Sequence, residues 1–276
     1  MSRSLPQTLP QSSNSSRSSI PRFRMVRTVI ALMLREMSTT YGRTPGGYVW
    51  ALMQPLGSII VFSLVMSVGL KVRSPGLGTN FPIFYASGIL PFQMFNNLSG
   101  KISSALPFSR ALLFYPRVSF IDAILARFLL NALTHLVVFI ILMTGLLALI
   151  DAHTLIDPVP VMIGLGGAML LAAGFGVLTG YLFQIYPVLG SVWNILSTPL
   201  LLMSGVLFLY DSLPRWGRDI LWYNPLVHII GLVRRGFYPM YEAAYVSVPY
   251  VVGVSMVMLA IGLLLLRRYY QDIISR

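Results

Sequence analysis

Cysteine is absent from the 276 residues, which excludes both a disulfide framework and a thiolate metal site. Acidic residues are scarce too: eight Asp and Glu stand against 20 Lys and Arg. Charged residues make up only 10% of the chain and hydrophobic residues 56%, a balance outside the range of soluble globular domains. Several apolar runs reach about twenty residues, the length that crosses ~30 Å of hydrocarbon as a helix. The sequence therefore indicates a polytopic membrane protein.

Motifs for catalysis are missing as well. A phosphate-binding loop needs the pattern G-x-x-x-x-G-K-[ST], but "FNNLSGKIS" has Phe95 at the first glycine position and Ile102 after the lysine. The three histidines, His135, His153 and His228, lie in separate segments without ligand-like spacing. We therefore expect that this chain is not an enzyme and that it holds neither a metal nor a cofactor.

The net charge of +12 would suggest nucleic-acid binding in a soluble protein. Here the basic residues mostly flank apolar runs, where they set membrane topology and contact lipid headgroups. We therefore expect membrane lipids, and no nucleic acid, as partners of these charges.

The sequence divides into three parts. Residues 1–21 are rich in serine and have almost nothing to bury, so we predict a disordered tail. Residues 22–44 predict an amphipathic interfacial helix, with Arg24, Arg27, Ala31 and Arg35 on one face and apolar side chains opposite. Residues 45–276 predict a six-span transmembrane domain.

The six predicted spans cover about 51–70, 81–102, 121–150, 160–181, 189–210 and 249–266. The second span has Pro91 at its centre and Asn96-Asn97 beyond the proline, so it should be kinked and face protein or water. The fourth span carries a small residue at every fourth position, which lets a neighbouring helix of the same subunit approach closely. These small residues are Gly164, Ala168, Ala172, Gly176 and Gly180. The predicted fold is an all-α polytopic membrane protein.

The stretch "LWYNPLVHIIGLVRRGFYP" is apolar but too short to span. Its mostly apolar part, with the residue before it, is the run 220–233. These fourteen residues would rise ~21 Å as a helix, which is less than the thickness of the hydrocarbon core, and Asn224-Pro225 interrupts the helix. Such backbone is tolerated at membrane depth only where it is buried in protein or lines a wet cavity. We predict re-entrant half-helices over about 214–235, entering from the outer side. With both termini cytoplasmic, fourteen Lys and Arg lie inside and six outside; a seventh span would give thirteen and seven.

Polar and aromatic side chains within the spans have two interpretations each. Arg127, Asn131, Thr134 and His135 form a stripe that either faces the bundle interior or a water path, or has Arg127 snorkelling to headgroups and Thr134 bonding its own backbone. The aromatic residues are either packing and interfacial belts or surfaces on which sugar rings stack. The segment 108–127 joins a short apolar helix, a Tyr-Pro break and Asp122 as a cap of the third span. It is either a docking helix for a soluble partner or a connector.

Four stretches together resemble the permease subunit of capsular-polysaccharide ABC exporters, within the polysaccharide and polyol-phosphate export permeases. They are "REMSTTYGRTPGGYVWALMQP", "GILPFQMF", "LFYPRVSFIDAILAR" and "WYNPLVHIIGLVRRGFYP". They run in family order and extend the resemblance over about residues 25–270. This chain departs from the family in "TPGG", where a basic or bulky residue is usual.

The resemblance implies a bacterial inner-membrane protein in which two permeases pair with two ATPase subunits, and ATP and Mg bind to those partners. Carried over by position, the ATPase contact would comprise Arg35, Glu36, Tyr41, Arg110, Phe114, Tyr115, Pro116 and Arg117. The polysaccharide path would comprise Trp50, Tyr85, Phe92, Phe95, Arg127, Asn131, His135 and Trp193. The outer gate would comprise Trp216, Trp222, Tyr223, Asn224, Pro225 and His228.

The predicted function is the membrane half of an ATP-driven exporter of capsular or related lipid-linked polysaccharide, acidic or neutral. Its partners would be a second copy, two ATPase subunits, the glycan or glycolipid, and periplasmic and outer-membrane export components. One alternative is an ABC exporter of O-antigen, teichoic acid, lipid or drug. The other is an integral-membrane glycan synthase, which would need acidic residues converging at one membrane face, whereas the eight acids here are scattered.

Overall fold

The computed structural model describes residues 24–41, 46–69, 74–113, 118–150 and 156–275. Within these ranges the regular structure is helical and no strand occurs. The prediction of an all-α membrane protein is thereby confirmed. The serine-rich tail, and the loop that holds His153, lie outside the described residues.

The helices follow the predicted order. The long ones are α2 (Gly47–Leu64), α3 (Phe81–Ser103), α5 (Phe120–Leu149), α6 (Pro158–Ile185), α7 (Pro187–Met203) and α10 (Val248–Ser275). The shorter ones are α1 (Arg24–Glu36), α4 (Ala105–Leu113), α8 (Arg215–Leu221) and α9 (Pro225–Phe237). Wider π-helical turns continue α1 as η1 (Met37–Tyr41) and α2 as η2 (Val65–Gly69), and η3 (Tyr210–Ser212) is a single 3₁₀ turn.

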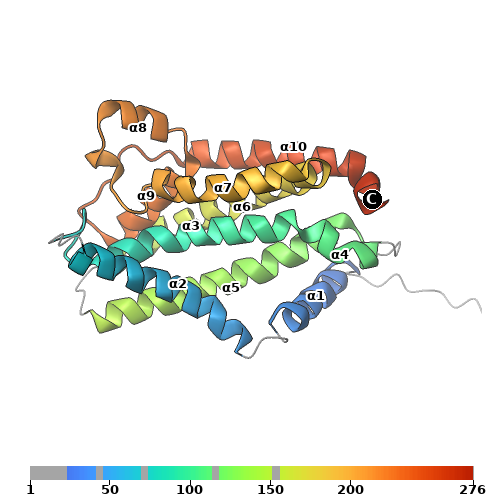
Figure 1. Ribbon diagram of the computed structural model, residues 1–276, viewed down its shortest axis with the longest axis horizontal. Helices are drawn as coiled ribbons and strands as arrows, with labels where there is room; N and C mark the ends of the chain where they lie inside the picture. The colour runs from blue at the N-terminus through green and yellow to red at the C-terminus, as the bar shows by residue number, and fades with distance from the viewer. Residues whose placement is uncertain (1–23, 42–45, 70–73, 114–117, 151–155, 276) are drawn as a thin grey trace, which may run out of the picture.

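Six helices correspond to the six predicted spans and run along the long axis of the molecule (Figure 1). By length and composition, four segments of the described chain are suited to crossing a membrane: 47–69, 120–149, 158–185 and 248–270. The other two are α7, which is apolar but shorter, and α3, which carries Gln93, Asn96, Asn97 and Lys101. These polar residues fit a span that faces protein or water, as its sequence predicts.

The fifth span ends earlier than the sequence predicts. It was expected to reach residue 210, but α7 ends at Met203 and Gly205 takes a φ of 74°. Glycine adopts this left-handed backbone without steric cost, so the chain turns here although apolar residues continue. The apolar run 206–209 therefore belongs to the turn and not to the helix.

Helix α6 lies at the centre of the bundle and packs against α3, α9 and α10. Its small residues allow this, because a methyl group at Gly164 would meet Val233 of α9 and one at Gly176 would meet Ile102 of α3. Ala168 and Ala172 are fully buried. The prediction that the ladder packs within one subunit is confirmed.

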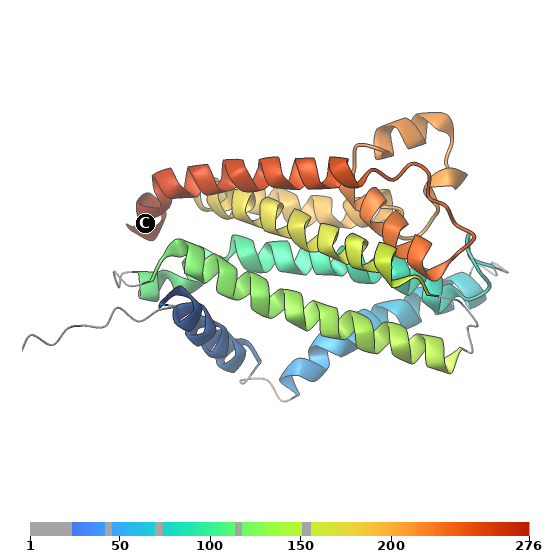
Figure 2. The ribbon, with the colours of Figure 1, turned by 180° about the vertical axis from the view of Figure 1, so that it is seen from behind.

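The two ends of the molecule differ. Helices α1 and α4 and the C-terminal end of α10 lie at one end, and α8 and α9 lie at the other (Figures 1 and 2). The predicted break falls at Asn224, whose side-chain oxygen accepts from the Leu226 backbone N–H at 3.0 Å, with Pro225 as the first helical residue. Helix α9 is buried along most of its length, whereas α8 is mostly exposed. The two half-helices of the predicted re-entrant segment are thus present.

Candidate functional site

A cavity of about 780 Å³ opens between α2, α3, α5 and α7. Helix α3 contributes side chains that polarity alone would exclude from lipid, among them Gln93, Asn96, Asn97 and Lys101. Helix α5 contributes Asn131, Thr134 and His135, and α7 contributes Trp193, Asn194 and Ser197. Helix α2 closes one side with Trp50 and Gln54. Four elements distant in sequence therefore converge on one polar cavity within an apolar bundle.

The chemistry of this lining suits a neutral or acidic ligand with many hydroxyl groups. Amides and hydroxyls donate and accept hydrogen bonds at comparable strength, as sugar hydroxyls do. The indoles of Trp50 and Trp193 offer apolar faces with one polar N–H each. Among the described residues that line the cavity, Lys101 is the one full charge and there is no carboxylate.

Trp193 is held in place by aromatic neighbours. Its ring centroid lies 4.3 Å from that of Phe175 and 6.5 Å from that of Phe95, which meets it edge-on. Phe95 is itself buried, so it supports the indole from behind and does not reach the cavity. Such ring pairs stabilise a fixed orientation by about 0.5–1.5 kcal/mol each.

Of the eight residues predicted to form the path, four line this cavity: Trp50, Asn131, His135 and Trp193. The other four, Tyr85, Phe92, Phe95 and Arg127, do not line it. Phe92 and Phe95 pack in the hydrophobic core, because α3 is buried on most of its faces. Tyr85 lines a second, smaller pocket, and Arg127 forms a buried ion pair with Glu36.

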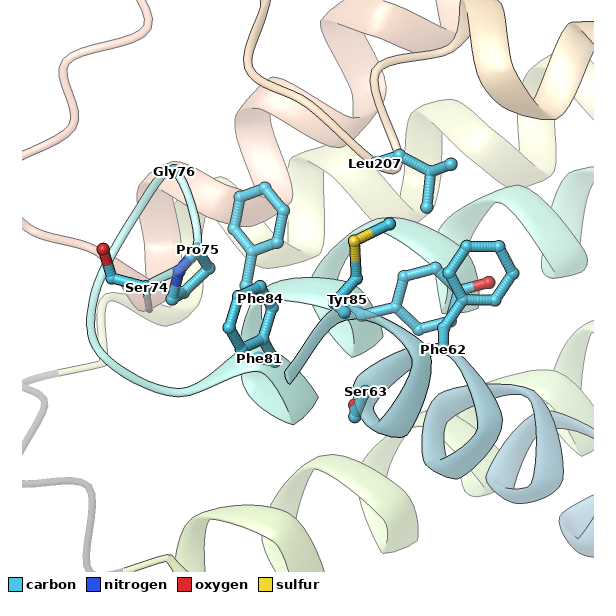
Figure 3. A pocket seen from close by; sticks show the side chains of 10 residues that line it. Phe62, Ser63, Ser74, Pro75, Gly76, Phe81, Phe84, Tyr85 and Leu207 are labelled. Carbon is cyan, nitrogen blue, oxygen red and sulfur yellow. The ribbon is translucent and has the colours of Figure 1, made fainter. Parts of the chain in front are cut away.

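Tyr85 belongs to a smaller apolar pocket of about 120 Å³ at the end of the molecule that holds α8 and α9. Figure 3 shows its ring beside that of Phe62, with centroids 4.5 Å apart and the planes almost parallel. Phe84 and Leu207 complete the wall. Its lining is too apolar to match the hydroxyls of a sugar.

Arg127 is buried and faces the interior of the bundle, as the first interpretation predicts, and it does not snorkel to the surface. Its Nε lies 3.4 Å from Glu36 Oε1, and its Nη1 donates to the Lys101 carbonyl at 2.8 Å and to Ser104 Oγ at 2.7 Å. A guanidinium has five donors, and a buried charge requires such partners. The second interpretation holds for Thr134, whose hydroxyl donates to the Leu130 carbonyl.

Glu36 was predicted to contact the ATPase. Only 2% of this residue's surface is exposed, and its carboxylate faces Arg127 of α5. Helix α1 buries Val29, Leu32 and Glu36 against α5, while Val26 and Ile30 of its apolar face stay exposed. The helix thus has a packing face in addition to its basic and apolar faces, which the amphipathic pattern alone did not separate.

Two other predicted contact residues, Arg35 and Arg110, lie at the end that holds α1 and α4. Arg110 is exposed, and the Arg35 guanidinium lies 5.5 Å from the Phe108 ring centroid. The side chain of Tyr41 and the stretch Phe114, Tyr115, Pro116 and Arg117 lie outside the described residues. The N-cap of α5 is Ser119, with Asp122 completing a capping box, so Asp122 acts there as predicted but at the third helical position.

At the opposite end, His228 is fully buried among aromatic rings. Its Nδ1 accepts from the Ser247 backbone N–H at 3.2 Å, so its Nε2 carries the proton and donates to the Trp222 carbonyl at 2.8 Å. Trp216 and Tyr223 are exposed, whereas Asn224 and Pro225 cap α9. Of the predicted gate residues, His228, Asn224 and Pro225 therefore hold the segment together, and Trp216 and Tyr223 are available to a ligand.

Sequence reasoning missed the most enclosed charge at this end. Arg234 donates to the carbonyls of Gly205 at 2.6 Å, Val206 at 2.7 Å and Phe208 at 3.0 Å. These carbonyls follow the C-terminus of α7, where a cation is favourable. Burial raises the pKa of nearby Tyr238 to about 12, so that phenol stays neutral. A charge in a largely apolar half-helix was the available signal.

Comparison with known proteins places this geometry in a family. The family model described as ABC-2 type transporter matches residues 27–238. The polysialic acid transport protein KpsM of Escherichia coli is 30% identical over 240 residues, covering 87% of this chain and 92% of that protein. The capsule polysaccharide export inner-membrane proteins BexB of Haemophilus influenzae and CtrC of Neisseria meningitidis are 27% and 25% identical, each covering 90% of this chain and 92% of the relative. The chain therefore belongs to the ABC-2 type transporter family, as a membrane-embedded transport permease and not an enzyme.

Proposed function

We infer that this chain is the membrane subunit of an ATP-driven exporter that moves a capsule-type polysaccharide across the bacterial inner membrane. The observation that carries this proposal is the amide-lined cavity with two indoles, in a chain similar to three capsule or polysialic acid transport proteins. Many weak contacts suit a polymer that must keep moving, because a single tight site would stop it.

A second copy of the chain completes the path. The cavity is open between α2 and α7, and α7 has no buried residue along its 17 residues. Val188 and Ile195 on α7, and Val61 on α2, expose large apolar surfaces. A copy that covers both helices buries these side chains and joins two cavities into one channel. Two ATPase subunits, which bind ATP and Mg, then act on the pair.

The end that holds α1 and α4 is assigned to the cytoplasm. Helix α1 and the C-terminal end of α10 lie together there (Figure 1), and this arrangement keeps the excess of basic residues inside. Helix α4, with exposed Arg110, and the segment 114–117 form the ATPase contact. Helices α8 and α9 form the outer cap, from which periplasmic and outer-membrane components receive the polymer.

The proposed cargo is an acidic polysaccharide carried on a lipid. Lys101, the one charged side chain lining the cavity within the described chain, attracts carboxylate or phosphate groups. An apolar drug or lipid would offer no hydrogen bonds to the amides of Gln54, Asn97 and Asn194, which costs binding free energy. O-antigen and teichoic acid remain cargoes of the same chemical kind.

Deletion of the gene in the organism that carries it tests this function. We expect the polymer to accumulate in the cytoplasm and to disappear from the cell surface, with both effects reversed by the intact gene. Normal polymer at the surface would contradict the proposal. Loss of the polymer from all compartments would indicate a synthetic role instead.

A further inference from the structure

Four elements of the chain meet at one buried ion pair. Glu36 ends α1, Arg127 lies in the second turn of α5, and their charged atoms approach to 3.4 Å. Both side chains are almost completely enclosed, with 3% and 6% exposed. This is the one pair of opposite charges within 4 Å in the described part of the chain.

Arg127 extends the connection to α3 and α4. The hydrogen bonds from Nη1 end at the Lys101 carbonyl, in the last turn of α3, and at Ser104, the corner between α3 and α4. Its guanidinium also lies 3.9 Å from the centroid of the Phe108 ring in α4. One side chain therefore contacts α1, α3 and α4 while standing on α5.

The same group borders the cavity. Lys101, Ser104 and Asn131 line it, and Asn131 Nδ2 donates to the Arg127 carbonyl at 2.8 Å and lies 3.5 Å from Glu36 Oε1. A displacement of α1 or α4 that moves Arg127 therefore moves atoms of the cavity wall directly. Arg127 contacts the wall residues Ser104 and Asn131 directly, with no loop between them.

Stability alone does not explain a pair in this position. Transferring two charges out of water costs several kcal/mol for each ion, and an apolar pair of similar volume is often as stable. The apolar contact between α1 and α5 is small, with Val29, Leu32 and Ala126 as its buried members. The ion pair instead gives α1 a single register against α5, since an apolar contact of this size is not directional.

We propose that the Glu36–Arg127 pair is the mechanical link that carries movement of α1 and α4 to the cavity, with Arg127 as its positioning residue. The proposal rests on the ATP-driven export proposed above. When the ATPase subunits displace α4 and the end of α1, the pair keeps both helices and the floor of the cavity moving as one body.

A double substitution separates a link from a merely structural pair. Glu36→Gln with Asn131→Asp moves the carboxylate from α1 onto α5, four residues from Arg127 on the same helix. That spacing brings the introduced carboxylate to the arginine and keeps the buried charges balanced. If the pair only stabilises the fold, export should survive this exchange. If the pair couples α1 to α5, the exchange removes the connection between the two helices and export should fall.

The measurement is polysaccharide exported per ATP hydrolysed by the complete complex with its ATPase subunits in membrane vesicles. We expect the double variant to assemble and hydrolyse ATP at half the wild-type rate or more, with at least tenfold less polymer exported per ATP. Export per ATP within twofold of the wild type would overturn the proposal. Asn131→Asp alone places the same carboxylate at the cavity wall but keeps Glu36 on α1, so it is the matched control and should export at least about fivefold more polymer per ATP than the double variant.

A distance measurement tests the link without cargo, and it uses the milder Glu36→Gln variant. Because the chain has no cysteine, spin labels can be placed singly at exposed Leu34 on α1 and Gly100 on α3. We expect a narrow distance distribution in the otherwise unchanged complex, unaltered when ATP binds, and a broad one that shifts with ATP in the variant. Identical distributions would overturn the link, whereas a wild-type complex that hydrolyses ATP without export would count against the proposed function only.

Discussion

The Arg234 guanidinium lies 4.1 Å from the centroid of the Phe84 ring, buried between α9 and α3. Three backbone carbonyls beyond the end of α7 accept its hydrogen bonds on the other side. One arginine thus fastens α9 to two of the long helices, and the outer cap depends on it.

The first prediction concerns this arginine. Arg234→Met removes three hydrogen bonds and leaves buried carbonyls unpaired, so we expect the free energy of unfolding to fall by about 2–4 kcal/mol. Denaturant titration of the purified protein in detergent, followed by circular dichroism, measures this change. Arg235→Met, at the exposed neighbour, should change stability little; equal losses in the two variants would show that burial is not the cause.

The second prediction concerns topology. A cysteine at Arg235 should react with a membrane-impermeant maleimide from the periplasm, because this side chain is exposed at the proposed outer end. A cysteine at Arg110 in α4 should react only after the inner membrane is opened. Arg234 is unsuitable for this test, although its sequence position suggests it, because only 2% of it is exposed. Reaction of both positions from the same side would contradict the topology.

The third prediction concerns sugar stacking. Trp193→Ala should reduce export roughly tenfold without changing the amount of protein in the membrane, since an aromatic contact worth about 1.4 kcal/mol changes a rate by that factor. Trp193→Phe should keep most of the activity. Tyr186→Ala removes an exposed ring near the cavity but outside its lining and should have no effect. Export at the wild-type rate in Trp193→Ala would remove the stacking role.

The fourth prediction concerns the charge of the cargo. Lys101→Gln should weaken export of an acidic polymer several-fold and leave export of a neutral one unchanged, because the cavity loses its one cation among the described lining residues. Lys101→Arg should keep the preference. Arg267→Gln, an exposed cation on α10, serves as the control. An equal loss of export for both polymers in Lys101→Gln would show that the lysine does not select the cargo by its charge.

The fifth prediction concerns helix packing. Gly174→Ala places a methyl group against the Ser255 carbonyl of α10, so we expect a loss of about 1–3 kcal/mol in stability. Gly166→Ala on the same helix has open space around it and should be neutral or slightly stabilising, since alanine is the better helix former. Thermal unfolding of both variants compares them, and equal melting temperatures would contradict the packing.

The sequence predicts where the helices of this fold lie along the chain better than it predicts which neighbour each helix face packs against. Apolar runs of membrane length and the break at Pro225 are local features, so α2, α5, α6, α10 and the two half-helices were predicted. The end of α7 was missed because the residues after Gly205 are as apolar as those of the helix itself.

Side-chain partners were harder to predict, because in a membrane protein both lipid and protein interior favour apolar residues and helical periodicity fades. Asn131 and His135 were identified because polar groups at that depth need water or protein, and Trp193 because aromatic rings can stack on sugars. The partners of Arg127 and Arg234 could not be predicted from the sequence. Glu36 and the carbonyls after the end of α7 lie many residues away from these arginines along the chain.

The most direct test of the proposed function is a transport assay with purified components. The chain and its ATPase partner are reconstituted in vesicles, a lipid-linked acidic polysaccharide is supplied with ATP on the side of the ATPase, and polymer protected inside is measured. We predict accumulation that requires ATP and is reduced in Lys101→Gln. ATP hydrolysis at a normal rate with all of the polymer left outside would contradict it.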